Sequence, residues 1–181
     1  MDHWTHICDS MKLNYKSWVV LISSCMFICY NNPIVGVIQY ILCILYAYIG
    51  HRLSHEPIAF LTNRAHIYHH ENKDWTSHAI QVCVEIASAF SPIFLYYYVL
   101  DISKTIFLFD PYIFLLFAIF YISVHNVNYG FFRVNRVHAK HHKDYTVNYG
   151  PDICDIIFKT KFPKDGIENT DHYIPNAIVA T

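Results

Sequence analysis

The chain has 181 residues, of which 54% are hydrophobic, 17% aromatic and only 15% charged, and its formal net charge is −1. Soluble domains carry about 25% charged residues, so this composition argues against an ordinary soluble domain. The near-neutral charge gives nucleic-acid binding little support, and the apolar content excludes intrinsic disorder. The six cysteines include no C-x-x-C pair, so we expect small buried apolar residues rather than a disulfide framework.

Four apolar stretches, taken in chain order, predict membrane-spanning helices at residues 17–30, 34–50, 79–100 and 111–124. The third stretch has the roughly 20 residues that a hydrocarbon core of ~30 Å requires. Residues 31–33 predict a hairpin between the first two, and Asp110 followed by Pro111 is typical of a helix start. We therefore expect an all-α integral membrane bundle of about four transmembrane helices.

The basic residues predict an orientation, because cytoplasmic flanks of membrane spans are enriched in Lys and Arg. With four spans, Lys104 alone of the 13 Lys and Arg residues falls on the far side. Both termini and the central segment are therefore expected in the cytosol, where a histidine-rich helical cap would lie. The polar first 16 residues and the absence of a small-residue cleavage site predict no cleaved secretory signal.

The 13 histidines are the unusual feature of the composition, and most of them are clustered. The clusters are an H-x3-H pair and two H-x2-H-H triplets: His51 and His55; His66, His69 and His70; His138, His141 and His142. Helix positions i, i+3 and i+4 share one face, so each cluster can present its rings to one point. Neutral imidazole binds iron, zinc, copper and nickel.

Two more histidines adjoin the apolar stretches, since His125 ends the fourth and His78 precedes the third. With His125, nine imidazoles exceed the three or four ligands of a zinc site and suit two ions better than one. His78 is an open candidate for a tenth ligand. The histidines outside these clusters are expected at the surface: His3, His6 and His172.

This pattern resembles the fatty acid hydroxylase/sterol desaturase superfamily of integral membrane enzymes, which carry boxes of the form H-x3-H, H-x2-H-H and H-x2-H-H. The resemblance extends from about residue 50 to 162, and residues 125–128 resemble the H-x-N element of the family. Residues 148–150 and 155–160 resemble its N-Y-G and D-x-x-F-G-T ending, although Lys159 replaces the usual glycine and Cys154 a common aromatic residue. We interpret residues 1–181 as a single domain of this type.

The resemblance implies a centre of two iron ions, with zinc possible in preparations, and dioxygen as co-substrate. Such a centre would hydroxylate or desaturate a fatty acyl, sphingolipid or sterol lipid. It also implies an external electron donor of the cytochrome b5 type with its reductase and, in a eukaryotic cell, the endoplasmic reticulum membrane. The implied catalytic metal ligands are His51, His55, His66, His69, His70, His125, His138, His141 and His142, with His78 as a further metal candidate.

Polar groups around the histidines are expected to orient the rings. The candidates are Glu71, Asp74, Asp144, Asp155, Asn126 and Asn148. Glu85, the one charge in the third apolar stretch, should face a polar cavity or partner. Residues 96–98 and 113–120 are candidates for the walls of a lipid cavity.

Three other functions stay open at this point. A carotenoid ring hydroxylase has similar length and boxes, although the N-Y-G ending favours the sterol desaturase branch. A membrane metal carrier would place its ligands in broken helices near the bilayer midplane, whereas these clusters follow helix ends. A zinc-dependent membrane hydrolase would be expected to carry an H-E-x-x-H motif, which this sequence lacks.

Overall fold

The structure is a computed structural model, and it describes residues 3–13, 15–72, 74–94, 110–123, 125 and 140–161. Every regular element in these ranges is helical, which confirms the all-α prediction for this part of the chain. The elements are α1 (His3–Leu13), α2 (Tyr15–Ile28), α3 (Pro33–Ser54), the short 3-10 helix η1 (Pro57–Ala59), α4 (Phe60–Glu71), α5 (Trp75–Phe94), α6 (Pro111–Ile122) and α8 (Asp152–Ile157).

Helices α2 and α3 form the predicted hairpin, with Pro33 at the first position of α3. The two helices approach closely at Gly36, where an added Cβ would lie 2.5 Å from the carbonyl oxygen of Cys25. Cys25 and Cys43 are buried in the core of this hairpin, as expected for small apolar residues. The lack of a side chain at Gly36 therefore sets the distance between the helices.

Helix α6 begins where the sequence predicts, at Asp110 and Pro111. The Asp110 carboxylate accepts a hydrogen bond from the backbone N–H of Tyr112 at 2.8 Å, which caps the helix. The backbone N–H of Asp110 donates to the side-chain oxygen of Gln39 in α3, also at 2.8 Å. An edge-to-face contact between the rings of Tyr40 and Phe117 continues the α3–α6 packing, so α6 is held against α3 along its length.

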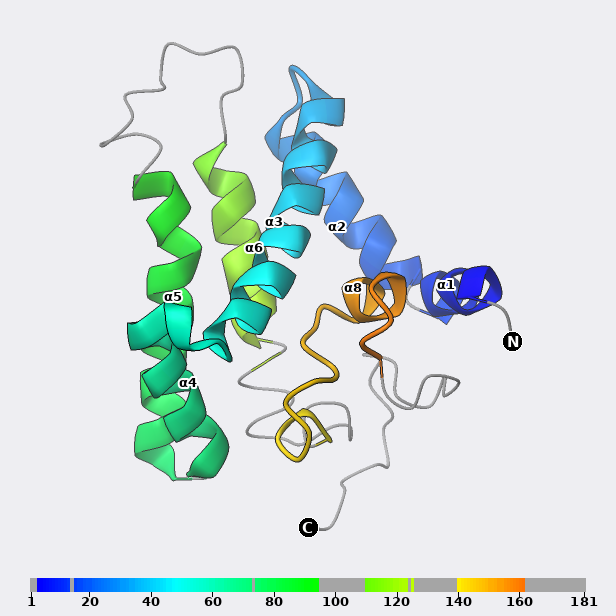
Figure 1. The fold of residues 1–181 in the computed structure, drawn as a ribbon. Helices are drawn as coiled ribbons and strands as arrows, with labels where there is room; N and C mark the ends of the chain where they lie inside the picture. The colour runs from blue at the N-terminus through cyan, green and yellow to red at the C-terminus, as the bar shows by residue number, and fades with distance from the viewer. Residues whose placement is uncertain are drawn as a thin grey trace.

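Helix α3 lies at the centre of the bundle, with α2 and α6 packed against it and α5 against α6 (Figure 1). Helix α4 packs on α5, while α8 packs on both α1 and α3. The end of α3, the last turns of α4 and the chain before α8 thus meet at one end of the bundle. The first two histidine boxes and the described part of the third belong to these same segments.

Among the described residues, one helix is long and apolar enough to cross a bilayer: α3, with 22 residues. Helices α2 and α6 are apolar but have 14 and 12 residues. Helix α5 has 20 residues but carries the polar residues Gln81 and Glu85 near its middle. The expected count of four membrane spans therefore stays unconfirmed, and the candidate wall residues 96–98 lie outside the described ranges.

Candidate metal centre

The first histidine box lies at the C-terminal end of α3. His51 is in the last turn of the helix, and His55 is its C-cap, with a backbone N–H that reaches the carbonyls of Arg52 and Leu53. The side-chain amide of Asn63 in α4 donates to the carbonyl of Ser54 at 2.9 Å. This bond fixes the start of α4 against the end of α3.

The second box occupies the last two turns of α4, so its three rings share a side of that helix, as the spacing predicts. His66, His69 and His70 are all buried, with His66 and His69 each 2% exposed. Because the C-terminal ends of α3 and α4 carry partial negative charge, both helix dipoles favour a cation beside these rings.

The third box is described from residue 140 onward, so His138 lies outside the described ranges. His141 is fully buried, and its Nδ1 donates to the carbonyl oxygen of Val147 at 2.6 Å. Tyr149 packs its ring against those of His51, His55 and His141, with centroids 5.5–5.9 Å apart. The turn that follows the box therefore orients His141 and covers the histidines.

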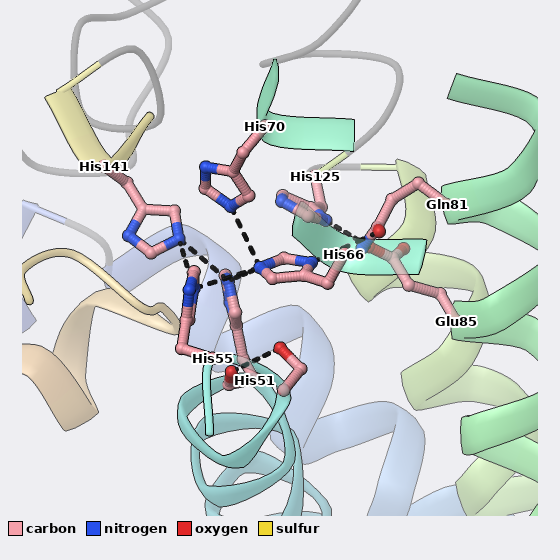
Figure 2. A network of polar contacts seen from close by, with 9 residues as sticks. His51, His55, His66, His70, Gln81, Glu85, His125 and His141 are labelled. Carbon is pink, nitrogen blue, oxygen red and sulfur yellow. Dashed lines mark hydrogen bonds and ion pairs between the residues drawn. The ribbon is translucent and has the colours of Figure 1, made fainter. Parts of the chain in front are cut away.

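Five imidazoles converge on one point, although they come from separate parts of the chain (Figure 2). Their Nε2 atoms all lie within 4.8 Å of one another. The close pairs are His51–His66 at 3.1 Å, His51–His141 at 3.0 Å, His55–His66 at 3.0 Å, His55–His141 at 3.2 Å and His66–His70 at 2.9 Å.

Hydrogen bonding does not account for this convergence. A neutral ring nitrogen carries either one proton or one lone pair, so each Nε2 can take part in a single hydrogen bond. Five such atoms can form at most two bonds, yet five contacts of hydrogen-bond length are present. Nitrogens at right angles around one ion are about 3.0 Å apart when metal–nitrogen distances are about 2.1 Å. The donor set and its spacing therefore fit a metal ion.

Burial keeps these imidazoles neutral, as metal binding requires. Desolvation lowers the pKa of His55 from 6.5 to about 4 and that of His141 to about 3, with neighbouring histidines adding to the shift at His141. The pKa of His66 and that of His70 are also depressed, again mainly by burial. At neutral pH the rings therefore present lone pairs rather than charges.

A second group of histidines surrounds His69. Its ring centroid lies 4.9 Å from that of His142, 5.2 Å from that of His78 and 6.4 Å from that of His125. Stacking of His142 on His70, with centroids 4.1 Å apart, joins this group to the first five. Of the ten sequence-predicted ligands, the nine that lie in the described ranges therefore gather in one region.

The partners of the second ring nitrogens differ from the acids that the sequence suggests. Gln81 faces Nδ1 of His66 at 3.3 Å, the Val147 carbonyl binds His141, and the Glu85 carboxylate contacts Nδ1 of His125. The prediction of a polar partner for Glu85 is thereby confirmed. Gln81 was missed, although it lies one helical turn before Glu85 and three residues after His78.

The predicted acids instead organise their own turns. Asp74 accepts from the backbone N–H of Ser77 at the start of α5, and Asp144 accepts from Thr146. Glu71 is exposed. Asp155 is fully buried and accepts from backbone N–H groups of its own segment. Asn126 lies outside the described ranges.

An apolar cavity of about 390 Å³ adjoins the histidines between α3, α5 and α6. His51, His66, Gln81 and Glu85 contribute to its wall on the histidine side. Phe114 and Phe117 line it from α6, so two residues of the predicted wall at 113–120 do face a cavity. Such a volume is typical of a small-molecule site with a few polar groups at one end.

A comparison with family models finds the fatty acid hydroxylase family over residues 36–160, about two-thirds of the chain. The chain belongs to the fatty acid hydroxylase family. No curated protein and no solved structure matches it. Membership in this family makes the chain a membrane-associated oxidoreductase. The histidine cluster seen in the structure is able to bind metal.

The segment that follows the third box closes the site through Asp155. Its carboxylate accepts from the backbone N–H groups of Tyr149 and Gly150 at 2.9 and 2.6 Å, and from the Thr160 hydroxyl at 2.6 Å. Lys159 has φ of 61°, a left-handed conformation that glycine adopts without strain. The glycine usual at this position is therefore explained by the backbone, and the lysine here is a strained substitute.

Proposed function

We propose that this member of the fatty acid hydroxylase family is a dioxygen-dependent lipid oxidase with two iron ions, which hydroxylates or desaturates a fatty acyl, sphingolipid or sterol substrate. One observation carries the proposal: five imidazole Nε2 atoms, from four buried histidines and the half-buried His55, converge beside an apolar cavity. A hydrolase or a carrier also needs metal ligands, but membership in an oxidoreductase family supports oxidation.

Two sets of residues would hold the ions. The first set is His51, His55, His66, His70 and His141. The second is His69, His125 and His142, with His78 close to His69 and His138 as a further ligand from sequence alone. When bound there, iron supplies the redox chemistry by which dioxygen attacks an unactivated C–H bond.

The protein's own contribution is to position the lipid and exclude water. Phe114, Phe117 and Tyr121 line the cavity from α6 and offer apolar contact to a hydrocarbon chain. His51 and His66 reach the same cavity, so a carbon held against its inner end lies next to the histidine centre. Chain length and ring content of the lipid would then be limited by the outer part of the cavity.

The reaction also requires electrons from outside the chain. Hydroxylation converts a C–H bond, dioxygen, two electrons and two protons into an alcohol and water, so a reductant must be supplied. We propose a cytochrome b5-type donor with its reductase, docking on the cytosolic side. In a eukaryotic cell the proposed location is the endoplasmic reticulum membrane, with the protein crossing it several times.

The test is lipid profiling of cells that express the intact chain or the double variant His66→Ala, His141→Ala. The variant His172→Ala serves as the matched control, because this histidine lies outside every box. We expect an oxidised lipid with the intact chain and the control but none with the double variant. Feeding heavy-isotope dioxygen separates the two products, since an alcohol retains the label and an alkene does not.

Metal analysis of the purified full chain tests the centre itself. Two irons per chain would support the proposal. Two zincs without redox activity would support a hydrolase, and metal flux across vesicles would support a carrier. Identical lipid profiles in several hosts would contradict the proposed oxidation.

A further inference from the structure

Two polar residues on α5 connect the two histidine groups. Gln81 and Glu85 lie one helical turn apart, and the Gln81 side-chain N–H donates to a carboxylate oxygen of Glu85 at 2.8 Å. The other end of Gln81, its amide oxygen, faces Nδ1 of His66 at 3.3 Å. The same oxygen of Glu85 contacts Nδ1 of His125 (Figure 2). The order of the connection is His66, Gln81, Glu85, His125.

The carboxylate at Glu85 determines the direction of every bond in this series. An ionised carboxylate only accepts hydrogen bonds, so Gln81 must turn its NH₂ group toward Glu85. Its amide oxygen is then directed at His66, which must carry its proton on Nδ1. The Nε2 of His66 is left with a lone pair, and this atom is the one that lies 2.9–3.1 Å from three other imidazoles.

The bond between Glu85 and His125 follows the same rule, that a carboxylate only accepts. Because Glu85 accepts from Nδ1 of His125, the proton of that ring is on Nδ1 and the lone pair is on Nε2. Both side chains of this pair are buried, with Glu85 9% and His125 8% exposed, so water competes little for the bond. One carboxylate thus orients one ring in each histidine group.

We propose that Glu85 and Gln81 are positioning residues that hold His66 and His125 in their metal-binding tautomers and couple the two halves of the centre. This inference rests on the proposed function, since the histidine groups are taken as the metal site. Partners of this kind orient a ring and raise its basicity, and their removal typically weakens metal binding about 10- to 100-fold.

A purely structural role for the two residues makes a different prediction. If Gln81 and Glu85 only join α5 to α4 and the end of α6, their removal lowers stability and leaves metal affinity in the folded fraction unchanged. A positioning role instead requires that metal affinity depends on the hydrogen-bond acceptor present at positions 81 and 85. Graded variants of nearly constant size separate the two roles.

The experiment measures the affinity of each ion equivalent by cobalt(II) titration of the detergent-purified full chain, with its absorption spectrum as a signature of the ligand set. The variants are Gln81→Leu, Glu85→Leu and Glu85→Gln, and Cys83→Ala is the control because Cys83 is exposed on the same helix. Helical circular dichroism and the thermal midpoint of the metal-free proteins report folding.

We expect Glu85→Leu to weaken both cobalt equivalents at least tenfold, Gln81→Leu to weaken one, and Cys83→Ala to weaken neither. Glu85→Gln should fall between Glu85→Leu and the parent, because its amide oxygen can accept the same bonds but is not obliged to. Nitrogen-15 spectra of the metal-free histidines should show the Nδ1–H tautomer at His66 and His125 in the parent and a mixture in Glu85→Leu.

Unchanged cobalt affinity and tautomers in both leucine variants would overturn the inference. If Glu85→Leu fails to fold, Glu85→Gln decides: parental affinity with parental tautomers at His66 and His125 would overturn it. The variant His66→Ala separates this failure from that of the proposed function. If His66→Ala loses cobalt while the Gln81 and Glu85 variants keep it, the positioning role is refuted. If His66→Ala binds cobalt as the parent does, the metal centre itself is refuted.

Discussion

Gly50 provides the sharpest test of the cavity, because it lies in the wall beside His51 and an added Cβ there would meet no atom within 4 Å. Glycine inside a helix costs about 0.5–1 kcal/mol relative to alanine. Gly50→Ala should therefore raise the free energy of unfolding by about that amount. Gly50→Leu should keep the gain while filling part of the cavity with its side chain.

The effect on substrate follows from the volume that the leucine takes. Its side chain occupies the place of about four methylene groups, each worth ~0.8 kcal/mol when buried, so a lipid chain would lose about 3 kcal/mol of binding. That loss corresponds to roughly a 200-fold rise in KM. A variant that is more stable than its parent yet far less active with the proposed lipid substrate is the expected signature.

Gly36 in the same helix supplies the matched control. The gain in helix propensity is equal at the two sites, but a Cβ at Gly36 would lie 2.5 Å from the Cys25 carbonyl oxygen. Gly36→Ala should therefore lower stability, by roughly 1–3 kcal/mol for overpacking. Thermal unfolding in detergent and oxidised lipid per molecule of folded protein are the two measurements. A Gly50→Leu variant with parental KM, or a Gly50→Ala variant less stable than its parent, would refute the inference that Gly50 faces open space in the wall of the substrate cavity.

Three further predictions concern the histidine end of the bundle. Lys159→Gly should raise the free energy of unfolding by about 1 kcal/mol, because it relieves the strain of the left-handed backbone. Lys143→Gly, on an exposed turn without positive φ, should not raise it. The thermal midpoints of the two variants test this difference. Asp155→Ala should cost at least about 3 kcal/mol in denaturant titrations, because buried N–H donors lose their acceptor; a loss under 1 kcal/mol would contradict the role given to this carboxylate. In the metal-free protein, the depressed pKa of His69 and that of His141, each about 3 against an ordinary 6.5, make the unfolded chain bind more protons below pH 6.5. Stability should be full above that pH and fall by up to about 1.4 kcal/mol per unit and per such histidine as the pH drops toward 3; flat stability would contradict their burial.

Local signals in the sequence predict much of the fold. The start of α6 follows from Asp110 and Pro111, since a capping side chain and a missing N–H suit a helix terminus whatever surrounds it. The α2–α3 turn follows from residues 31–33 in the same way. Helical spacing also predicts which rings of the second box share a side of α4. Each of these features depends on contacts within a few residues.

The ring partners could not be predicted as well, because they depend on tertiary contacts. The acceptor for His141 is the backbone carbonyl of Val147, a group that every residue has and no motif marks. Gln81 reaches His66 only because α5 packs against α4. Asp74 and Asp144 are close to histidines in sequence, yet backbone N–H groups in their own turns bind them more directly.

The convergence of five lone pairs also bears on how the protein persists in a cell. Mutual repulsion of these nitrogens disfavours the folded state until a cation neutralises it, and a cation at a hundred times its Kd adds about 2.7 kcal/mol of stability. A change of that size alters the fraction of chains open to degradation by roughly a hundredfold. With iron as the proposed metal, iron starvation should therefore reduce the amount of this protein as well as its turnover, so that nutrient supply would regulate abundance without any dedicated sensor.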